Sequence, residues 1–304
     1  MRKAFLLVTV LYSTICYSQE FLNLWPTGAM PNSKGMNITD SIFNERIYRV
    51  GDPGMWMFFP SKQENKRGVV VICPGGGYHH EAYIISGIEL AKWFNTFGMN
   101  SFVLKYRLPI SPDLKNRAIA PLQDVQRALR IIRANASEWN IDPQKIGVMG
   151  TSAGGHLAST VGTHPEDNSA IGDSIDAFSY LPDFMILISP VIDLGKYAEI
   201  GSRDNLLGID ASKELITKYS SQLHVTSKTP PAFIVHAEND KIVSVNNSLL
   251  FYQALIDSNV NASLHVFPEG GHEINLRNNP GSTEMWSTLC KLWITEMGFN
   301  DPTH

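Results

Sequence analysis

The sequence predicts an α/β fold with a mainly parallel central sheet and helices on both of its faces. Strand-like and helix-like segments alternate from residue 47 onward, and residues 68–73 form a run of mostly β-branched apolar side chains. Alternation requires crossover connections and therefore parallel strands, and such a run is typical of a strand buried on both faces. With 304 residues, 43% of them hydrophobic, the chain can bury one sizeable core.

The expected elements follow one another without an internal repeat or a low-complexity linker. Residues 48–50 and 55–59 are expected to form an N-terminal hairpin about the turn 51–54. Further strands are expected at residues 68–73, 101–108, 145–149, 184–189, 232–237 and 263–267. Helices are expected at residues 87–97, 121–139, 156–159, 212–219, 248–258 and 284–297.

Two of these helices have clear boundary or periodicity signals. Apolar side chains recur at steps of three and four residues from Leu122 to Trp139, and Pro121 occupies the first turn, where a proline is tolerated. The helix at 87–97 is closed by Gly98. These segments are therefore expected to cover the sheet with one apolar face each.

The longest interruption of the alternation lies at residues 195–231, between two expected strands. Ligands of open α/β sheets bind at the carboxyl edge of the strands. We interpret this segment as a small cap over that edge, within a single domain that spans residues 19–304.

The first 18 residues have the pattern of a secretory signal peptide. Arg2 and Lys3 precede an apolar run at residues 4–15, and small residues stand three and one positions before a cleavage site that would leave Gln19 first. The run is too short to span a bilayer comfortably. We therefore expect a secreted or periplasmic protein that has no membrane association after signal cleavage.

The charge argues against one class of binding partner, and the cysteine content argues against a disulfide-linked fold. The net charge is −4 at pH 7, and the lysines and arginines are scattered, so the sequence lacks the basic stripe that nucleic-acid binding requires. After signal cleavage two cysteines remain, Cys73 and Cys290, which are too few for a disulfide framework and are expected to be free. No sequence feature indicates an oligomeric state.

A G-x-S-x-G pattern at residues 150–154 follows the expected strand 145–149 and opens a helix. In this setting the serine sits on a sharp turn that exposes its hydroxyl at the top of the sheet. The N-terminus of the following helix carries a partial positive charge, which favours an oxyanion formed during acyl transfer. A structural glycine-rich turn is the alternative, but the flanking strand and helix favour Ser152 as a nucleophile.

A serine hydroxyl needs a base at neutral pH, and that base needs an orienting acid. His272 follows the last expected strand and is preceded by two glycines that allow close backbone approach. The histidines at 156, 236 and 265 lie within a helix or strands and are interpreted as core or wall residues. We therefore expect His272 to be the base.

Asp240 is the candidate for the acid, because it follows the strand 232–237 and gives the chain order Ser, Asp, His. Asp193, one strand earlier, and Glu238, two residues upstream, remain alternatives. The simpler role for Asp193 is to cap the turn before Gly195.

Three consecutive glycines follow the buried strand at 68–73, after Pro74. They let backbone N–H groups turn toward a small anion, so Gly76, Gly77 and Ala153 are the expected oxyanion-hole donors. A phosphate-binding loop would need a Walker lysine or G-x-G-x-x-G, and this segment has neither.

His79, His80 and Glu81 follow the same loop. Adjacent residues rarely ligate one ion together, and the sequence offers no second cluster of ligands, so we expect neither a metal nor a cofactor. We interpret the three residues as lining the pocket or packing beneath it, with Tyr78 and His79 as candidate substrate-binding residues.

Together these motifs resemble the α/β-hydrolase superfamily, and more narrowly the small secreted bacterial carbohydrate esterases that include acetyl xylan esterases and feruloyl esterases. Nearly the whole mature chain is covered, including residues 102–107, 121–124 and 142–147. The resemblance implies an α/β-hydrolase fold with the triad Ser152, Asp240 and His272. Related lipase-like esterases carry histidine in an H-G-G-G loop where this chain has Pro74, so another group must hold the loop.

The implied activity is that of a serine carboxylic-ester hydrolase, which removes acyl groups, foremost acetyl, from hemicellulose-type polysaccharides or oligosaccharides through an acyl-enzyme. Feruloyl substrates remain an alternative. So does a prolyl-oligopeptidase-like peptidase, although such enzymes usually carry a large propeller domain for which this chain has no room. The intact Ser, Asp and His set argues against a binding module without catalysis.

Overall fold

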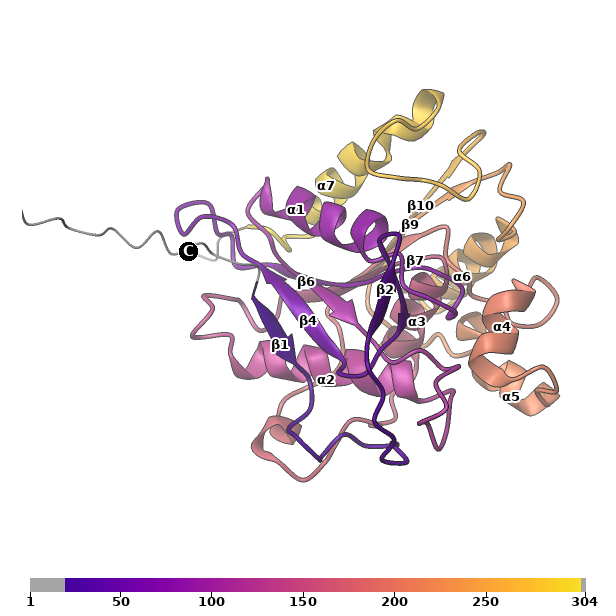
Figure 1. Ribbon diagram of the computed structural model, residues 1–304. Coiled ribbons are helices and arrows are strands. Elements are labelled where there is room, and N and C mark those ends of the chain that lie inside the picture. The colour runs from indigo at the N-terminus through magenta and orange to yellow at the C-terminus, as the bar shows by residue number, and fades with distance from the viewer. Residues whose placement is uncertain (1–19, 302–304) are drawn as a thin grey trace, which may run out of the picture.

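A computed structural model describes residues 20–301, so the expected signal peptide lies outside the described residues. An eight-stranded sheet in the order β1-β4-β6-β5-β7-β8-β9-β10 forms the centre of the molecule (Figure 1). All neighbouring pairs from β6 to β10 are parallel, whereas β4 runs antiparallel to both β1 and β6. The strands are β1 (Phe21–Asn23), β4 (Gly54–Phe58), β5 (Val69–Cys73), β6 (Asn100–Lys105), β7 (Ile146–Thr151), β8 (Met185–Ile188), β9 (Ala232–Ala237) and β10 (Ala262–Phe267).

Helices cover both faces of this sheet, which confirms the predicted fold class (Figure 1). One apolar core lies between the sheet and α2, α3 and α6, and the other lies between the sheet and α1 and α7. Such coverage buries both faces of the inner strands, which explains why every residue of β5 and β9 is buried and why all of them except His236 are apolar. The helices are α1 (Glu89–Asn95), α2 (Ala120–Ala134), α3 (Ala153–Thr163), α4 (Ile200–Leu207), α5 (Lys213–Lys218), α6 (Asn246–Asp257) and α7 (Trp286–Glu296).

The predicted hairpin between residues 48–50 and 55–59 is wrong. β3 (Arg46–Arg49) instead pairs with β2 (Ser41–Phe43) in a separate two-stranded sheet. β4 joins the main sheet between β1 and β6, where Met55 is fully buried opposite Leu104. Burial in the central sheet thus outweighs pairing with the nearest strand in sequence.

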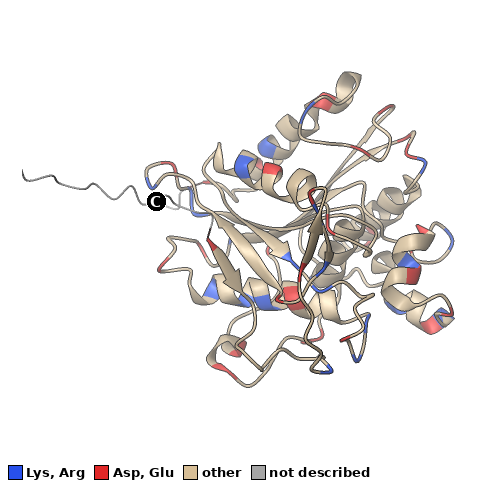
Figure 2. Ribbon diagram, in the orientation of Figure 1, with Lys and Arg blue, Asp and Glu red and all other residues tan. Residues whose placement is uncertain are grey.

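The helix expected at 121–139 ends at Ala134, where the Asn135 side chain donates to the Ile131 carbonyl at 2.8 Å. Its arginines fix the segment before β8 through ion pairs of Arg130 with Asp167 at 2.8 Å and of Arg133 with Asp183 at 3.0 Å. Elsewhere charged residues are spread over many elements (Figure 2). Within residues 20–301, no helix combines the length and the apolarity needed to cross a membrane.

The parallel strands β5, β7, β9 and β10 end at one edge of the sheet. The loops that follow them contain the three glycines, Ser152, Asp240 and His272, respectively. Topology therefore gathers at one edge the residues that the sequence spreads over about two thirds of its length, as expected for open α/β sheets.

Candidate active site

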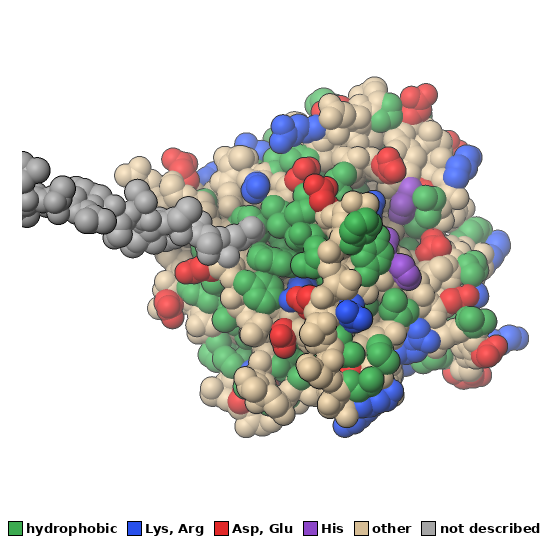
Figure 3. Space-filling view, in the orientation of Figure 1, with side chains coloured by type: hydrophobic (Ala, Val, Ile, Leu, Met, Phe, Trp, Pro, Cys, Tyr) green, Lys and Arg blue, Asp and Glu red, His purple; other side chains and the backbone are tan. Residues whose placement is uncertain are grey.

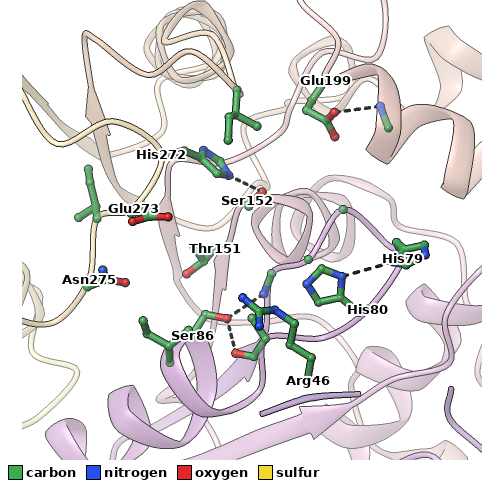
Figure 4. A pocket seen from close by; sticks show the side chains of 18 of the residues that line it. Arg46, His79, His80, Ser86, Thr151, Ser152, Glu199, His272, Glu273 and Asn275 are labelled. Atoms are coloured by element: carbon green, nitrogen blue, oxygen red, sulfur yellow. Dashed lines mark hydrogen bonds between the residues drawn. The ribbon is translucent and has the colours of Figure 1, made fainter. Parts of the chain in front are cut away.

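Ser152 occupies a strained turn between β7 and α3, with φ of 57° and ψ of −122°. The turn is so tight that a Cβ on Gly150 would lie 2.0 Å from the Gly154 carbonyl oxygen. The Ser152 N–H donates to the Ile188 carbonyl at 3.0 Å, which ties the turn to β8. A non-glycine residue with positive φ is costly and persists only when its surroundings impose it. Ser152 is therefore held with its side chain at the pocket (Figure 4).

A continuous hydrogen-bonded chain leads from this serine to a carboxylate. Ser152 Oγ lies 2.9 Å from His272 Nε2, and His272 Nδ1 lies 2.7 Å from Asp240 Oδ2. The carboxylate keeps the hydrogen of the neutral imidazole on Nδ1, so Nε2 is free to accept the serine proton. The arrangement can therefore activate a hydroxyl as a nucleophile.

Asp240 is held on both of its oxygens. Its Oδ1 accepts from the N–H groups of Ile242 at 2.8 Å and Val243 at 3.0 Å, while His236 Nε2 lies 3.2 Å from its Oδ2. Burial raises the pKa of Asp240, but the hydrogen bonds of His236 and His272 outweigh this and place it well below its ordinary value. The carboxyl group therefore stays ionised at neutral pH.

The two alternative acids lie elsewhere. Asp193 accepts from the N–H groups of Gly195 at 3.1 Å and Tyr197 at 2.8 Å, so it caps the turn before Gly195. Glu238 is exposed. Within the described residues, neither carboxylate hydrogen-bonds to a histidine.

Histidines 156, 236 and 265 do not reach the serine. His156 is buried on α3 and bonds to the Tyr78 hydroxyl at 2.8 Å and the Tyr219 carbonyl at 2.7 Å. His236 bonds to Ser248 Oγ at 2.7 Å, and His265 lies within β10. Their interpretation as core or wall residues agrees with these contacts.

Two N–H groups of the glycine loop, residues 74–77, point away from the carbonyl groups that form the local hydrogen bonds of this segment. The Gly75 carbonyl accepts from Ala82 N at 2.8 Å, and the Gly76 carbonyl accepts from His79 N at 3.1 Å. Carbonyl and N–H point in opposite directions across a trans peptide, so the N–H groups of Gly76 and Gly77 point the other way. Among the described residues these two groups and that of Ala153 have no acceptor.

Three side chains hold the glycine loop where related esterases use a histidine. The Tyr106 hydroxyl donates to the Pro74 carbonyl at 2.9 Å, and Ser86 Oγ accepts from Gly75 N at 3.1 Å. Asn205 Nδ2, on α4, donates to the Gly77 carbonyl at 2.8 Å. Burial raises the pKa of Tyr106 well above its ordinary value, so the group remains a donor. The sequence carried no signal for these partners, because no local pattern links Tyr106, Ser86 or Asn205 to the glycine loop.

A pocket of about 510 Å³ opens above Ser152 (Figure 4). Segment 195–231 contributes Glu199, Gly201 and Asn205 to its lining. The pocket wall also includes Ile85, Ser86, Leu90, Ile242, Ile274 and Leu276.

The residues after the glycine loop divide between the pocket and the core. His79 and His80 line the pocket. Tyr78 does not, because its side chain is 1% exposed and packs between Tyr106 and His156. Glu81 is buried and accepts from Tyr106 N at 2.8 Å, so it packs beneath the loop as the sequence suggested.

Residues 55–255 match the BD-FAE family, a stretch that includes Ser152 and Asp240 and ends before His272. The chain belongs to the BD-FAE family. This member is 36% identical to the acetylxylan esterase of Xylanibacter ruminicola over 73% of its own length and 44% of the relative. It is 34% identical to endo-1,4-beta-xylanase B of Butyrivibrio fibrisolvens over 86% of its length and 41% of the relative.

The BD-FAE chain therefore spans less than half the length of these two relatives. Among solved structures, it is similar to the acetyl ester-xyloside bifunctional hydrolase from Caldicellulosiruptor lactoaceticus, with a TM-score of 0.79 and 34% identity. That match covers 94% of this chain and 99% of the other. The fold is therefore that of the α/β-hydrolases.

Proposed function

We propose that this protein is a serine carboxylic-ester hydrolase in which Ser152 is the nucleophile, His272 the base and Asp240 the orienting acid. The observation that carries the proposal is the unbroken series of contacts from Asp240 through His272 to Ser152 Oγ, at 2.7 and 2.9 Å. This series of contacts ends at Ser152, which lies on a strained turn that faces a pocket. Such a constellation is recognised by its geometry and by its roles.

In the first half-reaction, Ser152 Oγ attacks the ester carbonyl while His272 Nε2 takes the hydroxyl proton. The carbonyl oxygen becomes an oxyanion that accepts hydrogen bonds from the N–H groups of Gly76, Gly77 and Ala153. His272 then gives its proton to the leaving alcohol as the ester C–O bond breaks, which leaves an acyl-serine. Water attacks this ester in the second half-reaction, and the proton returns to Ser152 through His272.

The proposed substrates are acetyl esters of hemicellulose-type polysaccharides or oligosaccharides. Two findings support this choice: the similarity to an acetylxylan esterase, and the similarity to an acetyl ester-xyloside hydrolase. A pocket of about 510 Å³ is larger than an acetyl group requires, which leaves room for a sugar unit beside the ester.

We further propose that residues 19–304 form one catalytic domain, in which segment 195–231 caps the pocket. The lining residues Glu199, Gly201 and Asn205 support this assignment. The N-terminal pattern supports export by residues 1–18.

One experiment separates the candidate substrates: acetate release from acetylated xylan, ferulate release from methyl ferulate, and amide cleavage of a prolyl anilide. We expect acetate release to dominate. Ser152→Ala should lower turnover by roughly 10⁵- to 10⁶-fold, because the nucleophile is lost while the backbone turn is kept by its neighbours. More than a few per cent of residual activity in a folded variant would contradict the nucleophile assignment. Preferential cleavage of ferulate or anilide would instead overturn the substrate class.

A further inference from the structure

A basic cluster, formed by Arg46, His79 and His80, lies on one wall of the pocket that contains Ser152. Arg46 comes from β3, which is distant from the glycine loop in sequence. The backbones of Ile47 and Glu81 exchange two hydrogen bonds, of 3.0 and 2.9 Å, which fix β3 against the chain just after His80. The backbone thus places the arginine beside the two histidines.

The two histidines of the cluster pack against each other, with 5.7 Å between ring centroids, and both pack against Tyr48. The Tyr48 ring lies 5.9 Å from the His79 ring and 5.3 Å from the His80 ring, between centroids. Burial lowers the pKa of His80, and the neighbouring charges of Arg46 and His79 lower it further. His80 is therefore mainly neutral at pH 7, and Arg46 holds the permanent charge of this wall.

This charge has no acidic partner in the part of the chain that the structure describes. Arg46 Nη1 donates to the Asn44 carbonyl at 3.3 Å but forms no ion pair there. The structure therefore presents a cation at the pocket that no carboxylate of residues 20–301 neutralises.

Two glutamates line the same pocket but do not serve this role. Glu199 caps α4 by accepting from the N–H groups of Gly201 at 2.9 Å and Ser202 at 2.6 Å. Glu273 lies on the His272 side of the pocket, whereas Arg46 and His80 lie across from it (Figure 4). Histidine side chains also reach the molecular surface beside the β2–β3 hairpin (Figure 3).

We propose that the basic cluster binds a carboxylate of the substrate, so that the enzyme favours esters that carry an acidic group close to the scissile bond. The inference rests on the proposed esterase function, since it concerns the same pocket. A neutral acetylated sugar offers Arg46 only uncharged acceptors, whereas a uronic acid or an acidic acyl group forms a charge-assisted hydrogen bond with its guanidinium. Because Arg46 is exposed, we expect an effect of about 3- to 10-fold in binding.

The first test compares two inhibitors that differ only in the carboxylate. Methyl β-D-glucuronide and methyl β-D-glucoside compete with hydrolysis of 4-nitrophenyl acetate in wild type, Arg46→Gln, Arg46→Lys and Arg49→Gln. Arg49 is the matched control, because it lies on β3 and is absent from the pocket lining. Wild type and Arg49→Gln should bind the glucuronide about 3- to 10-fold more tightly than the glucoside, and Arg46→Gln should lose this preference. Arg46→Lys should retain part of it, because the charge remains.

The second test asks whether the carboxylate belongs to the acyl group. The ratio of kcat/KM for 4-nitrophenyl hemisuccinate to that for 4-nitrophenyl butyrate is measured in the same four proteins. An Arg46-dependent preference for the hemisuccinate assigns the site to acidic acyl groups, and one for the glucuronide assigns it to uronic acids. If neither preference depends on Arg46 in enzyme that hydrolyses 4-nitrophenyl acetate, the inference is overturned. Wild-type protein without any esterase activity would refute the proposed function instead.

Discussion

The loops after β8 and β9 are similar because a buried aspartate shapes the turn in each, but they differ in which side chain that aspartate contacts. Each begins near a buried aspartate, Asp193 or Asp240, that accepts backbone N–H groups from residues shortly downstream. In the β8 loop, Gln222 Nε2 donates to an oxygen of Asp193 at 3.0 Å. In the β9 loop, the second oxygen of Asp240 meets His272 at 2.7 Å. A carboxylate that shapes a turn thus becomes available for chemistry only where a histidine reaches it.

Strand order explains the difference between the two loops. His272 follows β10, and β10 pairs with β9 and not with β8. The loop that follows β10 therefore lies next to Asp240, whereas Asp193 follows a strand one position farther away in the sheet. The β8 loop is instead anchored from α6, where Asn247 Oδ1 accepts from the N–H groups of Ile192 and Asp193. We expect changes in the β9 loop to affect turnover and changes in the β8 loop to affect stability.

The paired variants Asp240→Asn and Asp193→Asn test this contrast with the largest expected difference. Asp240→Asn should lower kcat by roughly 10³- to 10⁴-fold, because the imidazole of His272 loses the partner that fixes its tautomer. Asp193→Asn should lower kcat by less than about tenfold, since its carboxylate serves the turn. Steady-state kinetics on an acetyl ester measure both. A reversal of the two effects would assign the acid to the β8 loop.

The glycine loop after β5 extends the comparison to backbone groups. Gly76 has φ of 135°, and a Cβ there would lie 2.1 Å from the His80 carbonyl oxygen. Gly76→Val should therefore displace the proposed oxyanion donors and lower turnover by at least about 10²-fold. A serine-reactive phosphonate should still label Ser152, though more slowly.

The matched control for Gly76 is Gly172→Val, which has φ of 87° but no atom within 4 Å of its Cβ position. It also places a side chain on a backbone with positive φ, but away from the pocket, so it should leave turnover near the wild-type value. Unchanged turnover in a folded Gly76→Val protein would show that the glycine loop is only a structural turn.

Asn205 tests whether segment 195–231 supports the glycine loop. Asn205→Ala removes the hydrogen bond to the Gly77 carbonyl and should lower kcat about tenfold, with a smaller change in KM for 4-nitrophenyl acetate. Asn205→Asp keeps the size of the side chain but lacks the donor, so it should show at least the same loss. An effect confined to KM would indicate that Asn205 contacts substrate and does not position the loop.

A change at Asn247 should lower stability and should have the smallest effect on turnover among these variants. Its side chain accepts from Ile192 N at 2.9 Å and Asp193 N at 2.8 Å and donates to the Tyr197 carbonyl at 3.0 Å. Asn247→Ala leaves these buried groups without partners and should lower the free energy of unfolding by about 1 to 3 kcal/mol. Turnover below the unfolding transition should change by less than about threefold. Denaturant unfolding measures the first quantity, and a large loss of turnover without loss of stability would remove the contrast between the loops.

Local signals in the sequence predicted most of the fold and the grouping of the site. The continuous apolar strands, the periodicity after Pro121 and the G-x-S-x-G turn each involve residues close along the chain. Their geometry is set by backbone sterics and side-chain periodicity, which neighbouring residues determine. The chain order of Ser152, Asp240 and His272 then sufficed to nominate residues that the structure brings into contact.

Tertiary structure alone decided the contacts between distant segments. β3 pairs with β2 and brings Arg46 to the pocket, Asn205 holds the glycine loop from 128 residues away, and Tyr78 points into the core. Asp193 and Asp240 each accept backbone N–H groups within their own loops, but Asp193 uses both oxygens and Asp240 only one, and the adjacency of β9 and β10 brings His272 to the other. Such choices depend on which surfaces become buried together when the whole sheet forms, and a pattern read along the chain does not contain that information.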